Sequence, residues 1–273
     1  MNKILNIVIH YANEEEVLSY ARMLNGQSIK DRISLIVVEN KKSLEPKIVL
    51  KDELQKLDMD IEVYTSNRNL GYFNGFMYGF KEYLASGKEI PFWTVLSNTD
   101  LIIDDNFAFE KLFDEKYDEK ISCISPSIYN LNRKTYDNPQ YKDRISLEKL
   151  LKTIFIHEHP LLSFMYLKLG KFKAKKSKQL KKDSQYCYAV HGCFIGMKYD
   201  LMEYLNKNEF KAFLFSEENY ISEMVLRLGK SCFYNSNVEI VHNEKQTTKL
   251  LGFKSRAKFF EESLKFIRNE FYQ

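Results

Sequence analysis

Residues 33–40, ISLIVVEN, indicate the fold most directly. Ile33–Glu39 is an almost unbroken run of aliphatic side chains, mostly β-branched, which is typical of a strand covered on both faces. Four further runs of the same kind are Ile4–His10, Ile61–Thr65, Phe92–Leu96 and Ile121–Ser125. Segments with helical spacing, such as Phe76–Leu84, alternate with these runs. This order predicts an α/β fold with a mostly parallel central sheet and helices on both faces.

Polar side chains gather where the predicted strands end. Ligands of open α/β sheets bind beyond the carboxyl ends of the strands, so these clusters mark the expected site. The clusters are His10-Tyr11-Ala12-Asn13, Glu39-Asn40, Ser66-Asn67-Arg68-Asn69 and Asn98-Thr99-Asp100.

The composition is that of an ordinary globular protein. The chain has 273 residues and a mass of 32.4 kDa, is 44% hydrophobic and 29% charged, and has a mean hydropathy of −0.41. These values exclude disordered, collagenous and multi-span membrane classes. The net charge of +4 is too small to indicate nucleic acid, so we expect no nucleic-acid partner.

The sequence favours the cytoplasm. None of the four cysteines forms a C-x-x-C pair, which is typical of reduced thiols, and the acids Glu14–Glu16 follow the first apolar run where a secretory signal would need a cleavage site. The longest apolar candidate, Leu151–Leu169, is interrupted by charged residues and is not expected to span a membrane.

Residues 129–186 interrupt the strand–helix pattern. Leu161–Leu169 (LLSFMYLKL) is apolar and aromatic, and lysines surround and follow it without an acid before Asp183. Eight lysines belong to this segment: Lys168, Lys171, Lys173, Lys175, Lys176, Lys178, Lys181 and Lys182. Two interpretations stay open. One is a solvated surface helix or loop, and the other is a peripheral contact with an anionic membrane at the inner face of the cell membrane.

The strand–helix pattern resumes after this segment. Tyr188–Met197 is predicted as one strand and Asp200–Lys207 as a helix, and a second helix is predicted from Glu217 to Arg227. Two short strands, Cys232–Tyr234 and Val238–His242, follow. From Thr247 a helical tail places Phe253, Ala257, Phe260, Leu264 and Ile267 on one side.

Several of these polar residues suit particular chemistry. Glu39 ends a buried strand and can accept hydrogen bonds from a base or ribose, or it can cap a loop. Gly71 stands before a helix, where glycine permits close backbone approach and the helix N-terminus attracts phosphate. Arg68 beside it can pair with a diphosphate. Asn98 and Asp100 on one turn can both reach a hard cation, or they can cap the next helix.

Two further positions carry ionisable groups next to predicted strands or helices. Glu217 and Glu218 open a helix; adjacent carboxylates raise each other's pKa, which suits a general base, although acids are also common in a first helical turn. His242 ends the last strand, where a structural role and a metal-ligand role are both open.

In this order the elements resemble family-2 glycosyltransferases of the GT-A fold, especially the bacterial rhamnosyltransferase-like branch. The resemblance spans residues 4 to about 248. It rests on seven segments: His10–Asn13, Val37–Asn40, Asn69–Gly79, Leu96–Asp100, His191–Met197, Phe215–Gly229 and Ile240–His242. The departures from the family pattern are Glu39 and Glu218 in place of aspartates, Phe73 in place of a small residue, Met77 in place of Asn, and a single carboxylate in Asn98-Thr99-Asp100.

The resemblance implies a single GT-A domain in parts: a nucleotide-sugar half (1–128), the basic insertion (129–186), an acceptor and catalytic-base half (187–248) and a helical tail (249–273). It implies an inverting transfer from a UDP- or dTDP-linked sugar to a glycan or lipid-linked glycan, in bacterial surface polysaccharide synthesis. Mn²⁺ or Mg²⁺ would be held by Asp100 and His242, and Glu218, with Glu217 as second choice, would be the base. The donor would contact Tyr11, Asn13, Glu39, Arg68, Asn69, Gly71, Asn98, Thr99 and Gly192.

Two other functions remain open from the sequence. The nonstandard Glu39, Phe73 and Met77 also fit a degenerate GT-A scaffold or binding subunit of a polysaccharide-assembly complex. A nucleotidyltransferase shares the sheet order, but it normally carries a glycine-rich loop after the first strand, which His10–Glu14 lacks. The sequence does not specify an oligomeric state.

Overall fold

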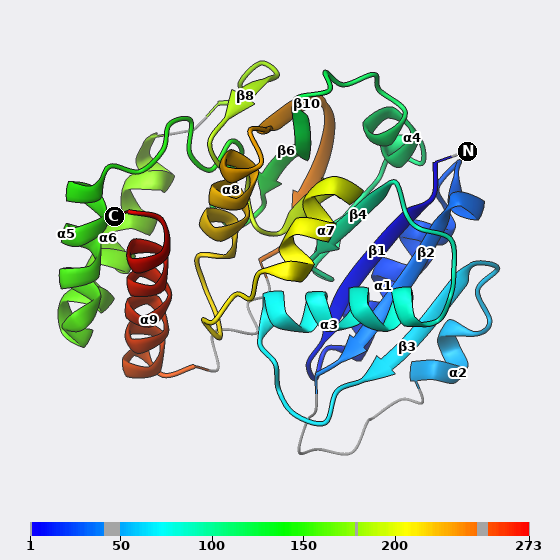
Figure 1. The fold of residues 1–273 in the computed structure, drawn as a ribbon, viewed down its shortest axis with the longest axis horizontal. Coiled ribbons are helices and arrows are strands. Elements are labelled where there is room, and N and C mark those ends of the chain that lie inside the picture. Colours follow the sequence, from blue (N-terminus) through cyan, green and yellow to red (C-terminus); the bar gives the residue numbers. More distant parts are fainter. Residues whose placement is uncertain (1, 41–49, 178–179, 245–250, 273) are drawn as a thin grey trace.

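The computed structural model describes the backbone of residues 2–40, 50–177, 180–244 and 251–272, and the side chains of these residues except 171–177. Ten strands within these ranges form one sheet (Figure 1). They are β1 (Ile4–His10), β2 (Ile33–Glu39), β3 (Asp60–Thr65), β4 (Trp93–Ser97), β5 (Leu101–Ile102), β6 (Ile121–Asn130), β7 (Thr135–Tyr136), β8 (Gln185–Cys187), β9 (Phe194–Lys198) and β10 (Ser231–His242).

The sheet order is β3-β2-β1-β4-β9-β6-β10-β5, with β7 on β6 and β8 on β10. The strands β3, β2, β1 and β4 are parallel neighbours, whereas β9 runs antiparallel between β4 and β6. The mostly parallel α/β sheet predicted from the sequence is therefore confirmed.

Helices cover both faces of the sheet. They are α1 (Glu14–Asn25), α2 (Leu50–Leu54), α3 (Tyr72–Ala85), α4 (Ala108–Phe113), α5 (Leu147–Glu158), α6 (Pro160–Ser177), α7 (Tyr199–Lys207), α8 (Glu217–Arg227) and α9 (Phe253–Phe271). Alternate residues of β2 enter two cores: Ile36 and Val38 pack with α3, and Leu35 and Val37 pack with α1. This two-sided burial explains why β2 has no polar position before Glu39 except Ser34.

Helices α5, α6 and α9 form a group at one end of the molecule (Figure 1). Helices α5 and α6 lie within residues 129–186, where the helical insertion is predicted, and the C-terminal helix α9 packs on them. The tail residues 247–250 and the side chains of Lys171, Lys173, Lys175, Lys176 and Lys178 lie outside what the structure describes. No helix in the described ranges has the length and apolar character needed to cross a bilayer.

Two strand predictions are wrong. Tyr188–Met197 is not one strand: β8 ends at Cys187, a turn occupies residues 192 and 193, and β9 begins at Phe194. The run 232–242 is one strand rather than two, with a register irregularity between Asn235 and Glu239 against β6. A turn with buried side chains has the same apolar pattern as a strand, so the pattern did not reveal the turn. A bulge within one strand likewise resembles a gap between two strands.

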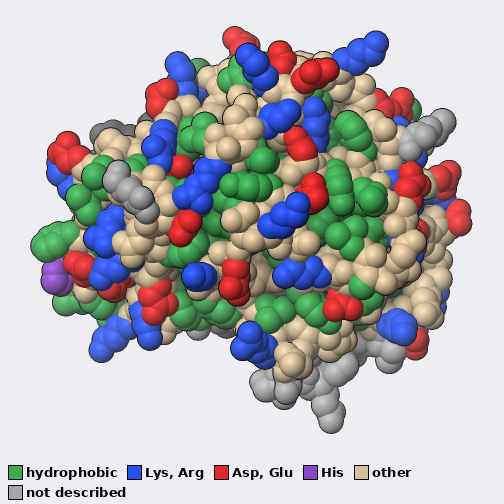
Figure 2. Space-filling model, in the orientation of Figure 1, with side chains coloured by type: hydrophobic (Ala, Val, Ile, Leu, Met, Phe, Trp, Pro, Cys, Tyr) green, Lys and Arg blue, Asp and Glu red, His purple; other side chains and the backbone are tan. Residues whose placement is uncertain are grey.

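Charged side chains of both signs are interspersed over the face seen in Figure 2. Apolar side chains are also visible at the left of that view, where α5 and α6 lie in Figure 1. The exposed apolar residues of α5 and α6 are Leu147, Leu151, Phe155, Leu161, Leu162, Phe164, Met165, Tyr166 and Leu169.

Candidate active site

Asn13 and Thr99 meet at the carboxyl ends of β1 and β4. The two strands are parallel neighbours, so the residues that follow them emerge at the same edge of the sheet. The Asn13 Nδ2 donates to Thr99 Oγ1 at 2.7 Å, and the Asn13 Oδ1 accepts from the Tyr11 N–H at 2.7 Å. Asn13 stands at the N-cap of α1 but makes no side-chain cap bond. Its amide instead joins two of the predicted donor-binding segments.

Glu39 lies beside His10 at the same edge, one strand further along. The register pairs His10 with Glu39, and the His10 Nδ1 is 3.8 Å from the Glu39 Oε1. Thr65, at the end of β3, donates its hydroxyl to the Glu39 Oε2 at 2.7 Å. The Glu39 side chain is about one third exposed, so its carboxylate is held in place and still reachable by a ligand.

Asp100 and His242 are brought together by the short ladder between β5 and β10. Leu101 pairs with His242 in that ladder, which places the preceding Asp100 next to the imidazole. The His242 Nε2 is 3.3 Å from the Asp100 Oδ1, and the side chains are 7% and 14% exposed. A carboxylate and an imidazole so placed form a donor set that accepts Mn²⁺. The predicted metal ligands therefore lie together and fit a divalent cation.

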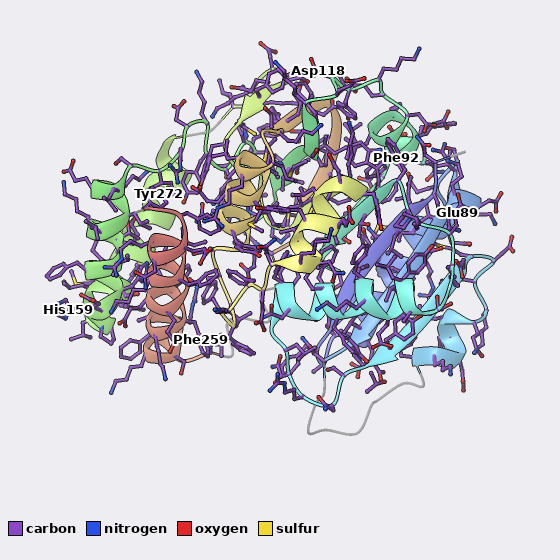
Figure 3. All side chains as sticks on the ribbon, in the orientation of Figure 1. Glu89, Phe92, Asp118, His159, Phe259 and Tyr272 are labelled. Atoms are coloured by element: carbon purple, nitrogen blue, oxygen red, sulfur yellow. The ribbon has the colours of Figure 1, made fainter. Side chains whose placement is uncertain are left out.

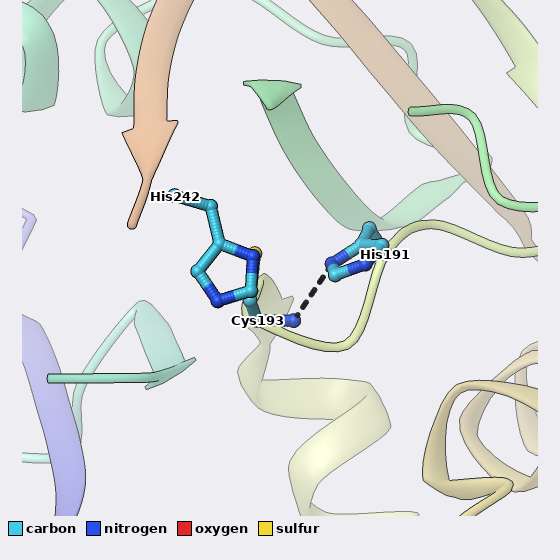
Figure 4. A group of neighbouring side chains, drawn as sticks. All are labelled: His191, Cys193 and His242. Atoms are coloured by element: carbon cyan, nitrogen blue, oxygen red, sulfur yellow. Dashed lines mark hydrogen bonds between the residues drawn. The ribbon is translucent and has the colours of Figure 1, made fainter. Parts of the chain in front are cut away.

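The turn between β8 and β9 adds His191, Gly192 and Cys193 to this group (Figure 4). The His191 Nδ1 accepts a hydrogen bond from the Cys193 N–H at 3.2 Å, and the Cys193 carbonyl accepts from the Asn98 N–H at 2.8 Å. Tyr72, in the first turn of α3, donates its hydroxyl to the Gly192 carbonyl at 3.3 Å. The turn thus connects the metal-motif segment to the glycine segment.

Glu217 and Glu218 open α8 after two residues in the left-handed region. Phe215 has φ 71° and Ser216 has φ 62°, a conformation that costs non-glycine residues about 1 to 2 kcal/mol each. The Glu217 Oε1 accepts from the Phe215 N–H at 2.9 Å, so this carboxylate braces the strained loop. The Glu218 Oε2 instead lies 3.6 Å from where a Cβ on Gly192 would stand.

Burial changes the acidity of both carboxyl groups. It raises the pKa of Glu217 to about 8, with a further contribution from the neighbouring Glu218 charge. Burial likewise raises the pKa of Glu218 above its usual range. Glu217 is buried, whereas Glu218 is partly accessible and turned toward Gly192. Of the two, Glu218 is therefore better placed to meet a substrate.

The segment from Arg68 to Gly71 is tied to the end of β2, because the Asn40 Nδ2 donates to the Gly71 carbonyl at 2.8 Å. The Asn69 Oδ1 accepts from the Gly71 N–H at 2.9 Å, and Arg68 and Asn69 line a cavity of about 670 Å³ between α3 and residues 205–213. Gly71 has φ 81°, and a Cβ on it would stand 2.0 Å from the carbonyl oxygen of Phe213. The protein's own packing thus requires glycine here, and contact of these residues with a diphosphate stays a prediction.

The sequence matches the family model described as Glycosyl transferase family 2 over residues 7–205. This match covers well over half of the chain. The chain belongs to glycosyl transferase family 2. A comparison of this family 2 chain with curated protein sequences finds no match.

Two solved structures show the GT-A architecture of this family 2 chain. A mannosyltransferase from Pyrobaculum calidifontis, in complex with GDP-Man and Mn²⁺, has a TM-score of 0.57 and 10% identity, covering 97% of this chain and 68% of its own. GalNAc-T7, with UDP, GalNAc and Mn²⁺, has a TM-score of 0.56 and 12% identity, covering all of this chain and 50% of its own. At these identities the likeness establishes the fold.

Three residues of the site were not singled out from the sequence. His191 and Cys193 are brought to His242 by the turn before β9, and Tyr72 reaches the same turn from α3. The segment His191-Gly192-Cys193 could have been recognised as a candidate site, since an imidazole and a thiol flank a glycine. The prediction of one strand over Tyr188–Met197 placed it in the middle of that strand and so concealed it.

Proposed function

We propose that this family 2 glycosyltransferase transfers a sugar from a nucleotide-sugar donor to an acceptor hydroxyl with inversion. The observation that carries this proposal is the position of the 191–193 turn. Gly192 of this turn lies near the Glu218 carboxylate, and its neighbours His191 and Cys193 lie near His242, which faces Asp100. A candidate base and a candidate cation-binding pair are thus both close to one turn, as a site for transfer requires.

The residues would divide the chemistry as follows. Glu39 and the bonded pair of Asn13 and Thr99 would orient the nucleoside at the strand ends, with Tyr11 nearby. Asp100 and His242 would hold Mn²⁺ or Mg²⁺, which supplies charge stabilisation for the leaving diphosphate when bound. Asn98, whose N–H is held by the Cys193 carbonyl, would present its side chain to the same group.

Glu218 would accept the proton of the acceptor hydroxyl. Sugar hydroxyls are weak acids, so a positioned base is worth about two to four orders of magnitude in rate. The attack would come from the face opposite the leaving group, which gives inversion. Arg68, Asn69 and Gly71 would serve the diphosphate only if the donor extends toward the cavity beside α3.

The donor and acceptor follow from the resemblance of the motifs to the rhamnosyltransferase-like branch. A UDP- or dTDP-linked hexose would be the donor, and a glycan or lipid-linked glycan of a bacterial surface polysaccharide would be the acceptor. The test is nucleotide release and sugar transfer with UDP-, dTDP- and GDP-sugars in the presence of Mn²⁺. Release of nucleotide from one donor class supports the proposal, and no release from any donor would favour a noncatalytic scaffold.

The helical group suits contact with an anionic membrane at the cytoplasmic face. Phe155 and Met165 are each 57% exposed and Leu161 is 70% exposed, while Lys168 lies 5.9 Å from the Phe164 ring. Exposed rings beside lysines are the arrangement of interfacial helices. Flotation with liposomes that contain anionic lipid should carry the protein upward. The double variant Phe155→Ser with Leu161→Ser should lose this binding, and flotation equal to wild type would contradict the assignment.

A further inference from the structure

We propose that His191, Cys193 and His242 form a binding site for Zn²⁺ within the cation region of the protein. One ligand atom from each of these three residues lies within 4.8 Å of the other two. Figure 4 shows both imidazoles beside Cys193. A thiol and two imidazoles prefer a borderline-soft cation, whereas Mn²⁺ and Mg²⁺ prefer oxygen.

His242 offers a buried ring nitrogen that is free to bind a cation among the described residues. Its side chain is 7% exposed, and its Nδ1 has no hydrogen-bond partner among the described residues. A buried nitrogen without a partner is costly, and a bound cation would satisfy it. The other ring nitrogen, Nε2, faces Asp100 at 3.3 Å, so Nδ1 is the atom left for the cation.

His191 also has one ring nitrogen directed to Cys193 and the other near a carboxylate. Its Nδ1 is directed to the Cys193 backbone N–H at 3.2 Å, and its Nε2 lies 3.9 Å from the Asp137 Oδ2. Histidines that bind metals usually donate their second ring N–H to a carboxylate, which fixes the ring and raises its basicity. Both imidazoles therefore have a carboxylate behind them and an Nδ1 toward the cysteine.

The geometry requires only small adjustments. Ligand atoms around tetrahedral Zn²⁺ are about 3.3 to 3.7 Å apart, given bonds of about 2.0 to 2.3 Å. The three side chains would close by roughly 1 Å, His191 would exchange the bond from the Cys193 amide for the cation, and the thiol would release its proton to solvent. A cavity of about 390 Å³ lined by His191 and Asp137 provides a route of entry.

Zinc at this site would oppose glycosyl transfer. Zn²⁺ on the His242 Nδ1 would place a second divalent charge beside Asp100, and the repulsion between the two ions would weaken binding of the cation of the donor diphosphate. This inhibitory consequence rests on the proposed function, whereas Zn²⁺ binding itself does not. Binding is therefore measured on the full chain without any nucleotide-sugar.

Calorimetry with Zn²⁺ and absorption spectroscopy with Co²⁺ test the site. We expect one equivalent of either metal and a sulfur-to-cobalt charge-transfer band. Cys193→Ser should abolish the band, and both Cys193→Ser and His191→Asn should weaken Zn²⁺ binding about tenfold or more. The control Cys187→Ser, a half-buried thiol outside the cluster, should keep both properties.

Several results would overturn the proposal. Co²⁺ binding without a thiolate band, or Zn²⁺ affinity unchanged by Cys193→Ser, would remove the cysteine from the site. If Cys193→Ser does not fold, as judged by circular dichroism, His191→Asn and Cys193→Ala answer the same question. Normal Zn²⁺ binding in a protein without transferase activity would leave the site standing and refute the proposed function alone.

Discussion

The rings of Phe215 and Phe260 are stacked face to face, with centroids 3.8 Å apart and an interplanar angle of 7°. Phe215 immediately precedes the strained Ser216 and the carboxylates that open α8, and Phe260 lies on α9. Phe260 also stacks on His157 of α5, with ring centroids 4.7 Å apart. The same side chain therefore joins α9 to α5. Figure 3 shows Phe259 on the side of α9 that faces the rest of the molecule, and its ring lies 5.2 Å from that of Phe213. The loop before α8 is thus held by the C-terminal helix.

Phe260→Leu should therefore lower kcat strongly while it changes the free energy of unfolding only slightly. Loss of the stacking partner frees the left-handed loop, and small misplacement of Glu218 is costly to catalysis. We expect kcat to fall roughly tenfold to a hundredfold with little change in donor KM. The control Phe253→Leu lies on the same helix, at a ring 42% exposed, and should retain activity. Equal effects of the two variants would show that the stack does not position the base.

Glu218→Gln should abolish transfer while donor binding persists. The amide keeps the shape of the side chain but cannot accept a proton, so kcat should fall by about two to four orders of magnitude. Donor affinity, measured by calorimetry with Mn²⁺, should stay within about threefold of wild type. Glu217→Gln should cost less, because its carboxylate is bonded to the Phe215 N–H. The reverse ranking would transfer the role of base to Glu217.

Glu217 should make the protein less stable as the pH rises. Its pKa is raised to about 8, so between the ordinary carboxyl range and pH 8 the folded state binds more protons than the unfolded state. The stabilising contribution is complete below about pH 4.5 and is lost as the pH rises to about 8, by at most about 5 kcal/mol. Urea unfolding from pH 5 to 9 should show this decline in wild type and a flatter profile in Glu217→Gln. The control is Glu203→Gln, which changes an exposed carboxylate on α7. If this variant flattens the pH profile as much as Glu217→Gln does, the assignment to Glu217 is refuted.

Asp100→Asn should remove the dependence of donor affinity on the cation. Wild type should bind the donor at least about tenfold more weakly in EDTA than in Mn²⁺, because Asp100 would hold an ion that offsets the charge of the donor diphosphate. The variant should show the weak affinity in both conditions. Asp104→Asn, which changes an exposed carboxylate just after β5, is the control. Unchanged wild-type affinity in EDTA would take the cation role away from Asp100.

Gly71→Ala should destabilise the fold much more than Gly87→Ala. Both glycines have positive φ, 81° and 73°, so each substitution costs about 1 to 2 kcal/mol for backbone conformation. Only Gly71 adds a collision with the Phe213 carbonyl, whereas the space around Gly87 is open. We expect a total loss near 4 kcal/mol for Gly71→Ala by urea unfolding. Similar losses for the two variants would mean that the Phe213 loop moves aside at little cost.

The sequence was sufficient for the parallel half of the sheet and for much of the site. Runs such as Ile33–Glu39 can be recognised as strands because burial on both faces excludes most polar residues. The register of β1 and β2 then places His10 opposite Glu39. The approach of Asp100 to His242 could be anticipated from the resemblance alone. Its physical cause, the two-residue pairing of β5 with β10, is too short to leave a pattern.

Contacts between distant aromatic residues were beyond prediction. Phe260 was expected only on the packed side of a terminal helix, and nothing in its spacing names Phe215 as its partner. The turn at Gly192 was hidden for a different reason: its neighbours Val190 and Cys193 are buried, so the segment has the composition of a strand. The apolar composition of a segment predicts that it is buried. It does not predict whether the buried backbone is a strand or a turn.

The pairing of β5 with β10 also has a kinetic consequence. It joins residues roughly 140 positions apart, and such distant pairings close slowly because their loop entropy must be overcome first. Asp100 and His242 can face one another only after that closure. In refolding experiments, the ability to bind a cation should therefore return later than the bulk of the secondary structure, and would report the moment at which the edge strand β5 has paired with β10.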